Sequence, residues 1–213
     1  MSEPLIEGPP AEQLVPPEPT LPSLRDAAAG CRACELWRLG TQTVFGEGPA
    51  PAPLMLVGEQ PGDEEDRAGH PFVGPAGRLL RLLLGEAGID PAAAFVTNAV
   101  KHFSFELRGK RRMHKTPVQR QIDACNVWLR KEIERIQPKV IVTLGTTALR
   151  AVVGEKLSII AARERVLVSP EGVPIIATYH PSAVLRAPQP EQRDQLRRVL
   201  LADLKRALGL AGK

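Results

Sequence analysis

The segment from residue 108 to 115 concentrates side chains that could bind a polyanion and attack an electrophile. It reads Arg-Gly-Lys-Arg-Arg-Met-His-Lys, and five of its eight residues are permanent cations. Clustered Lys and Arg in a loop are typical of contacts with a phosphate backbone. His114 lies among these cations, and an imidazole in its neutral form is a candidate nucleophile or base. The alternative is a solvated basic loop with an incidental histidine.

A second group of residues has the spacing of metal ligands. Cys31 and Cys34 form a C-x-x-C pair, and Cys125 is the third and last cysteine of the chain. Three thiolates leave a zinc ion or an iron–sulfur cluster one ligand short, and His102 is the candidate for the fourth. The alternative is one reactive pair and a buried apolar cysteine. An N-terminus unlike a signal peptide predicts an intracellular, cytoplasmic protein. In such a protein the odd cysteine number disfavours a disulfide framework and favours metal or cluster ligation.

The elements that must position these residues alternate along the chain. Short apolar runs predict four buried strands, at 54–57, 94–97, 140–144 and 175–178, with an additional edge strand at 165–168. Helical patterns separate them, at 77–87, 117–136, 146–153 and 191–208. The alternation predicts an α/β fold whose parallel sheet is covered on both faces. Ligands of such sheets bind beyond the C-terminal strand ends.

Segments that follow the strands carry side chains suited to a site. Glu59 could orient an imidazole or a water, and Asn98 could read one edge of a nucleobase. His180 could donate a hydrogen bond to a carbonyl oxygen that gains negative charge. Phe72, in a loop between glycines, is a candidate platform for stacking a base. Each residue also has an ordinary alternative role. Glu59 could be an exposed carboxylate in a turn, Asn98 could cap a turn, and Phe72 could anchor the core. The His-Pro-Ser tripeptide that contains His180 is by itself a weak signal of function.

Length and charge are consistent with one folded domain and a separate tail. The 213 residues are 43% apolar, and no run is long enough for a transmembrane helix. Residues 1–22 contain seven prolines, four glutamates and no Lys or Arg, so they are expected to form a disordered tail. The domain is expected to span 23–213, with Ser23 capping a helix over 24–30 and Thr116 capping the helix that starts at Pro117.

The motifs, in this order, resemble those of the uracil-DNA glycosylase superfamily, over most of the chain after the tail. The C-x-x-C pair, GEQPG at 58–62, HPFVGPAGRLL at 70–80, TNAVK at 97–101 and HPS at 180–182 resemble its iron–sulfur branch, known as family 4. Family 4 typically has cysteine where this chain has His102. That histidine, the glutamine of GEQPG and KRRMH at 110–114, which matches a K-R-R-I-H loop, resemble the UdgX class.

The resemblance implies a three-layer α/β/α fold around a four-stranded parallel sheet. It implies a 4Fe–4S cluster with a structural role, held by Cys31, Cys34, His102 and Cys125. It also implies excision of uracil from DNA, preferably single-stranded, by a monomer with no membrane association. After excision, His114 would capture C1′ of the abasic site and form a lasting covalent bond.

The remaining roles implied by the resemblance involve the strand ends and the basic loop. Glu59 and His180 would assist His114 in catalysis. Substrate would be contacted by Gly58, Gln60, Phe72, Asn98 and Ser182, and DNA by Lys110, Arg111, Arg112 and Arg186. Two other functions stay open: a family 4 hydrolase that releases the abasic site, and a non-enzymatic iron–sulfur protein that only grips DNA.

Overall fold

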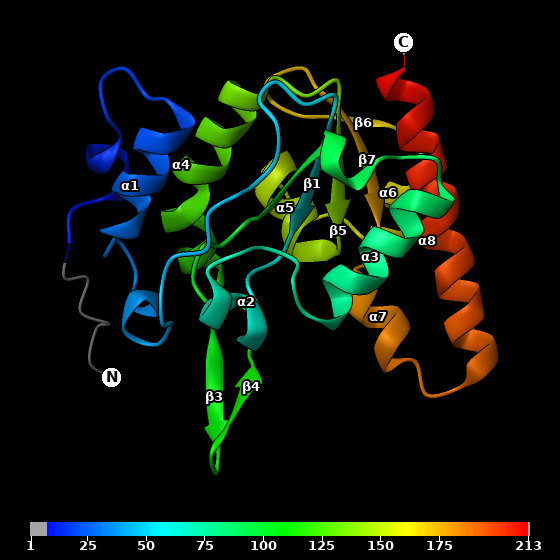
Figure 1. Cartoon of the computed structure of the whole chain (residues 1–213), viewed down its shortest axis with the longest axis horizontal. Coiled ribbons are helices and arrows are strands. Elements are labelled where there is room, and N and C mark those ends of the chain that lie inside the picture. The colour runs from blue at the N-terminus through cyan, green and yellow to red at the C-terminus, as the bar shows by residue number, and fades with distance from the viewer. Residues whose placement is uncertain (1–7, 213) are drawn as a thin grey trace.

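A five-stranded sheet lies between two layers of helices in the computed structural model, which describes residues 8–212 (Figure 1). The strand order is β2-β1-β5-β7-β6. The strands are β1 (Leu54–Gly58), β2 (Ala94–Asn98), β5 (Val140–Leu144), β6 (Leu167–Val168) and β7 (Pro174–Thr178). The first four in this order are parallel, and β6 pairs antiparallel with β7. The predicted four-stranded parallel sheet and the additional edge strand are confirmed.

Both faces of the sheet are covered, which explains why its central strands are continuous apolar runs. Met55 and Val57 pack into one core, and Leu54 and Leu56 pack into the other. The first face is covered by α1 (Leu21–Ala29), α4 (Gln119–Ile136) and α5 (Thr146–Val153). The second is covered by α3 (Pro75–Glu86), α7 (Pro181–Arg186) and α8 (Pro190–Ala211). Two short helices, α2 (Asp63–Ala68) and α6 (Ile159–Arg163), complete the α-helices of the described residues.

The N-terminal segment is more ordered than its composition predicts. A 3-10 helix, η1 (Ala11–Leu14), lies against α4, and Ala11 is 1% exposed in the core. Helix α1 begins at Leu21, where Thr20 and Ser23 form a capping box, so Ser23 is not the N-cap. The expected boundary at residue 22 therefore falls inside a packed segment, because a few apolar contacts outweigh the effect of the prolines. Residues 1–7 lie outside the described residues.

Two further details differ from the prediction. Helix α4 begins at Gln119 after an extended Val118, so Thr116 and Pro117 precede it and do not cap it. The basic segment is not a loop but part of a hairpin of β3 (Phe105–Arg108) and β4 (Arg111–His114), turned at Gly109 with φ 62°. Figure 1 shows this hairpin projecting from the body of the protein beside α2. No helix within residues 8–212 is both long and apolar enough to cross a bilayer.

Candidate active site

The candidate side chains lie at the edge of the sheet where its parallel strands end. Gly58, the last residue of β1, is in register with Asn98, the last residue of β2. Strand β7 ends at Thr178, two residues before His180. Because parallel strands end at one edge, Glu59, Asn98 and His180 come together from segments far apart in the sequence.

Asn98 and Phe72 both pack closely against the backbone of Gly58, where no Cβ would fit. A Cβ on Gly58 would lie 2.3 Å from Asn98 Oδ1 and 2.7 Å from Phe72 Cζ. Asn98 is 3% exposed and Phe72 is 8% exposed. The Phe72 ring stacks on His180 with 6.3 Å between centroids and 28° between ring planes. An aromatic ring, an amide and an imidazole therefore lie near one another at this edge of the sheet.

The loop that presents Phe72 has an unusual backbone conformation. Phe72 has φ 56°, in the left-handed region, which costs a bulky residue about 1–3 kcal/mol. Helix α3 packs directly against this loop, because a Cβ on Gly77 would lie 1.8 Å from the Phe72 carbonyl oxygen. Strain of this kind persists only where the surroundings enforce it, and it is concentrated at ligand sites.

The hydrogen bonds of His180 determine which of its ring nitrogens carries the proton. The Ser182 N–H donates to Nδ1 at 3.1 Å, and Ser182 Oγ lies 2.7 Å from the same nitrogen. Nδ1 is therefore an acceptor, so the proton is on Nε2. Burial lowers the pKa of His180 to about 4, against the opposing charge of Glu59, so the ring is neutral near pH 7. Ser182 orients His180 in this structure, and its contact with substrate stays a prediction.

Glu59 connects the sheet edge to the hairpin. Its Oε1 lies 3.1 Å from Nε2 of His114, whose side chain is 47% exposed. Its Oε2 accepts a hydrogen bond from the Thr147 hydroxyl. Burial alone would raise the pKa of Glu59, but the hydrogen bonds from His114 and Thr147 outweigh burial and lower it. The carboxylate therefore stays ionised and can orient the imidazole.

Gln60 clamps the two ends of the hairpin together. Its Nε2 donates to the carbonyl of Ser104 at 3.0 Å and to that of Lys115 at 3.2 Å. Its Oε1 accepts the N–H of Ser104 at 3.0 Å. Gln60 was predicted to contact substrate, but both ends of its amide are engaged by backbone groups. Its role in this structure is to fix where the hairpin leaves the protein body.

Arg112 anchors the hairpin to α2. Its Nη1 donates to Asp66 Oδ2 at 2.6 Å, and its Nε donates to Asp63. The Arg112 side chain is 13% exposed, and its guanidinium lies 5.1 Å from the centroid of the Phe105 ring. Arg112 was predicted to contact DNA, but its charge is paired with two carboxylates of the protein. This pairing stabilises the position of His114 two residues later.

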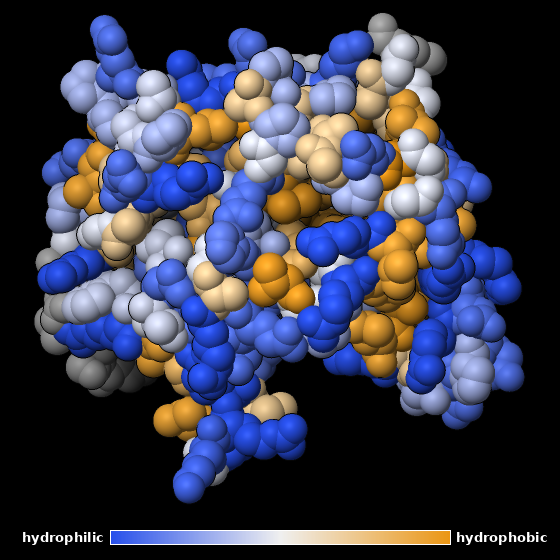
Figure 2. All heavy atoms as spheres, viewed as in Figure 1, coloured by the Kyte–Doolittle hydropathy of each residue, from blue (hydrophilic) through white to orange (hydrophobic). Residues whose placement is uncertain are grey.

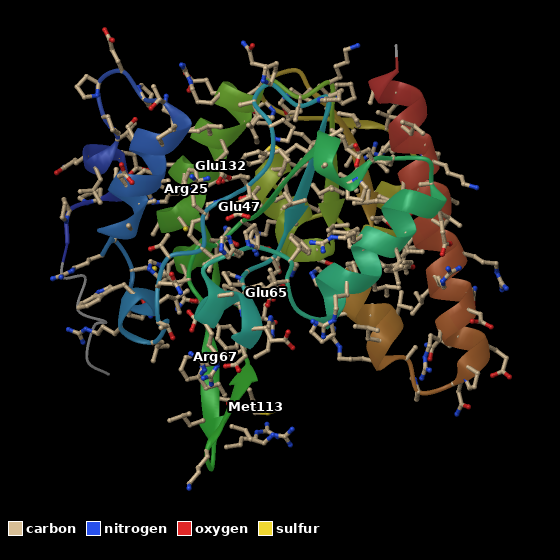
Figure 3. All side chains as sticks on the ribbon, in the orientation of Figure 1. Arg25, Glu47, Glu65, Arg67, Met113 and Glu132 are labelled. Carbon is tan, nitrogen blue, oxygen red and sulfur yellow. The ribbon has the colours of Figure 1, made fainter. Side chains whose placement is uncertain are left out.

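The other predicted DNA-binding cations are exposed. Lys110 and Arg111 lie at the turn of the hairpin, and Arg186 lies at the end of α7. Figure 2 shows the hairpin as a mostly hydrophilic projection at one end of the molecule. In Figure 3, Met113 on the hairpin lies at the same end as Glu65 and Arg67 of α2. The exposed cations could therefore meet a polyanion that approaches this end.

A second site lies between α1, α4 and the segment that follows β2. Cys31, Cys34, His102 and Cys125 line one small cavity together with Trp128. Burial raises the pKa of Cys34 to about 11 and that of Cys125 to about 12. Thiols of this kind are poor nucleophiles, which argues against a reactive role for Cys34 and Cys125. The predicted ligand residues therefore share one cavity.

The lining of this cavity offers three cysteine thiols and one imidazole as possible ligands. Within residues 8–212, no three His, Cys, Asp or Glu side chains form a group that could hold one metal ion. Trp128 is 1% exposed, and its indole N–H has no hydrogen-bond partner among the described residues. An unpaired buried donor indicates that the cavity accommodates a group with acceptor atoms, such as sulfide.

One buried lysine links the two sites. Lys101 Nζ donates to the Asn98 carbonyl at 2.8 Å and to Glu132 Oε2 at 2.7 Å, and both charged side chains are 1% exposed or less. The Lys101 N–H donates to Cys125 Sγ at 3.2 Å. Figure 3 places Glu132 on α4, away from the hairpin. The backbone of Asn98 is therefore held by the same residue that contacts a cysteine of the cavity.

Several of these supporting residues were not identified from the sequence. They include Asp63, Asp66, Lys101, Trp128 and Thr147. Asp63 and Asp66 belong to an acidic run at 63–66 that has the composition of a solvated helix face. Their spacing of three residues places both side chains on one side of a helix, and this spacing could have indicated that they act together. Thr147 is bonded to Glu59 and Lys101 to Glu132, both distant in sequence, and the Trp128 N–H has no partner among the described residues, so composition gave no signal for these three.

Comparison with known proteins is consistent with this arrangement. Residues 45–205 match the family model described as the uracil DNA glycosylase superfamily. A type-4 uracil-DNA glycosylase of Thermotoga maritima is 40% identical over 178 residues, covering 83% of this chain and 87% of that protein. One of Sulfurisphaera tokodaii is 34% identical over 200 residues, covering 90% and 85%. A type-5 uracil-DNA glycosylase of Pyrobaculum aerophilum is 30% identical over 180 residues, covering 77% and 76%. This chain belongs to the uracil DNA glycosylase superfamily.

Proposed function

We propose that this protein excises uracil from DNA, preferably single-stranded, and then becomes covalently bonded to C1′ of the abasic site through His114. The observation that carries the proposal is the 3.1 Å contact between His114 Nε2 and Glu59 Oε1, at the edge of the sheet where Asn98 and His180 meet. The imidazole is held by an ionised carboxylate beside the space that would receive the base. The histidine hairpin and His102 also support assignment to the UdgX class.

Excision would use the residues of the sheet edge. A uracil turned out of the strand would stack on Phe72, and the Asn98 amide would form hydrogen bonds with its edge. Turning the base out costs less free energy in a single strand, where it is not paired. Cleavage of the N-glycosidic bond leaves negative charge on uracil and positive charge on the sugar. The Nε2–H of His180 would donate to a uracil carbonyl as this charge develops, and one such preorganised donor is worth about 3 kcal/mol.

Capture would use the hairpin. An imidazole nitrogen of His114 would form a bond to C1′ in place of water, and the remaining ring proton would pass to Glu59 or to solvent. Glu59 would also balance the positive charge of the sugar before the bond forms. Lys110, Arg111 and Arg186 would contact phosphates, where each Lys or Arg replaces condensed counterions.

The test is a denaturing gel with uracil-containing and thymine-containing single strands. The wild-type protein should give a slowly migrating adduct with the uracil strand alone. His114→Ala should abolish the adduct, while His70→Ala, which removes another exposed histidine, should retain it. Full adduct formation by His114→Ala would refute the assignment of the nucleophile. Size-exclusion chromatography would test the expectation that the protein acts as a monomer.

The names of the type-4 relatives favour a second candidate, a hydrolytic glycosylase that turns over and releases an abasic site. In that case water attacks C1′ and His114 only positions the sugar or Glu59. Free uracil in excess over enzyme, with no adduct in the gel, would select this candidate.

We further propose that the cysteine cavity holds a 4Fe–4S cluster, with Cys31, Cys34, His102 and Cys125 as its ligands. The shared cavity, the buried thiols and the unpaired Trp128 N–H support this assignment. When bound, the cluster would tie α1, α4 and the segment after β2 together, and the excision chemistry requires no electron transfer. Iron and sulfide analysis of purified protein tests it.

A further inference from the structure

The hydroxyl group of Thr43 lies between His102 and helix α1. Thr43 Oγ1 is 3.0 Å from His102 Nε2 and 3.1 Å from the carbonyl oxygen of Ala28. Ala28 lines the same cavity as His102 and lies three residues before Cys31. The Ala28 carbonyl also accepts the Cys31 N–H at 3.0 Å. One carbonyl group therefore connects the cysteine turn with the histidine.

The direction of these hydrogen bonds follows from the number of protons. A hydroxyl group has one proton, and a carbonyl oxygen can only accept. Thr43 must therefore donate its proton to Ala28, and its oxygen accepts a hydrogen bond from His102. Nε2 of His102 is then the protonated nitrogen, and the lone pair of the neutral ring is on Nδ1.

The backbone holds Thr43 in this position. The N–H of Val44 donates to the Lys101 carbonyl at 2.8 Å, so the segment containing Thr43 runs beside the segment containing His102. His102 is 7% exposed, so its ring is enclosed by neighbouring residues. Both the tautomer and the orientation of the ring are thus fixed by neighbouring residues.

We infer that Thr43 is the positioning residue for His102, so that Nδ1, and not Nε2, faces the group held in the cavity. The inference rests on the proposed cluster, and it assigns the iron-binding atom of its one nitrogen ligand. Histidines that bind metals commonly donate their other ring N–H to an oxygen acceptor, which fixes the tautomer. Here that acceptor is a threonine hydroxyl whose own proton is committed to the backbone of α1.

Selective isotope labelling of the whole protein tests the assignment. The cluster-containing protein is prepared with histidine carrying ¹⁵N at Nδ1 alone or at Nε2 alone, and its paramagnetic reduced form is studied by pulsed electron paramagnetic resonance. We expect the strongly coupled nitrogen to change from ¹⁴N to ¹⁵N with the Nδ1 label only. A change with the Nε2 label only would overturn the inference. His102→Cys should remove the strong nitrogen coupling and so identifies the signal as that of His102.

Variants of Thr43 test its positioning role. Thr43→Val keeps the shape of the side chain but removes the hydroxyl group, and Thr43→Ser restores it. Thr43→Val should lose iron to a chelator about 10-fold faster than wild type, in the range usual for outer-shell partners, and Thr43→Ser should be close to wild type. Equal rates for all three proteins would exclude a role for the hydroxyl. Wild-type protein that contains no iron would instead refute the cluster itself, so the two failures are distinguishable.

Discussion

The sheet edge and the hairpin bring two histidines to one site in very different environments. His180 belongs to the edge, where burial lowers its pKa to about 4 and Ser182 fixes its tautomer. His114 belongs to the hairpin, where its side chain is 47% exposed and its Nε2 lies 3.1 Å from Glu59 Oε1. The edge is part of the packed core, whereas the hairpin is attached to it through Gln60 and Arg112. This difference predicts that the two proposed steps, base excision and sugar capture, can be separated by mutation.

The largest expected effect is at the edge. His180→Asn should lower the rate of uracil release by about 10²–10³-fold, because a preorganised donor to the leaving base is lost. Adduct formation should fall equally, since capture requires prior cleavage. The measurement is single-turnover uracil release from a radiolabelled strand. His114→Ala is the matched comparison, and it should lose the adduct but keep uracil release. If both variants lost uracil release equally, the two regions would not be separable.

Arg112 tests the attachment of the hairpin. Arg112→Gln leaves Asp66, a fully buried carboxylate, without its guanidinium partner, which should destabilise the fold by about 3 kcal/mol. The rate of adduct formation should fall about 10-fold, because small displacements of a reacting group are costly, while uracil release changes less. Denaturant unfolding and the gel assay measure the two effects.

Arg111→Gln is the control for this variant, because Arg111 is an exposed cation next to Arg112. It should weaken DNA binding and reduce the salt dependence of binding, with little change in stability. Equal loss of stability in both variants would contradict the anchoring role of Arg112.

The pH dependence of stability should report the burial of His180. The pKa of His180 is about 4 when folded, compared with an ordinary value of 6.5, so between these values the unfolded chain binds a proton that the folded protein does not. Stability should therefore decrease as pH falls from about 6.5 towards 4, by up to about 1.4 kcal/mol per pH unit. His180→Asn should have a shallower slope over this range, as measured by urea unfolding. An unchanged slope would contradict the burial of a neutral His180.

The smallest expected effect is at Trp128, which lines the cysteine cavity. Trp128→Phe keeps an aromatic ring but removes the unpaired N–H, so it should change the reduction potential of the proposed cluster and accelerate loss of iron to a chelator several-fold. Uracil release should remain close to wild type. Redox titration and chelator kinetics provide the measurements, and wild-type values in both would show that the indole donates no hydrogen bond to the cluster.

The sequence predicted the framework well because each strand is a short apolar run with polar residues at its end. Such a pattern is local, and it places Glu59, Asn98 and His180 at one edge without knowledge of their contacts. The hairpin was not predicted, because its strands are highly charged and lack the alternation of a half-buried strand. Its turn signal was Gly109, whose positive φ permits a tight reversal.

The roles of Gln60 and Arg112 could not be predicted for a different reason. Both residues have side chains that could bind substrate or phosphate. The sequence does not show that these side chains already form hydrogen bonds with other groups of the protein. The partners of Gln60 are Ser104 and Lys115, more than 40 residues away along the chain. Only the tertiary structure reveals that these side chains hold the hairpin.

The clamp at Gln60 makes the hairpin a separable unit of the chain. Because the segment enters and leaves at adjacent backbone positions, it can be added to the sheet edge without altering the path of the remaining chain. A transplant of residues 104–115 into a hydrolytic relative, together with glutamine and the two aspartates at the matching positions, would test whether the hairpin suffices for the proposed covalent bond to DNA.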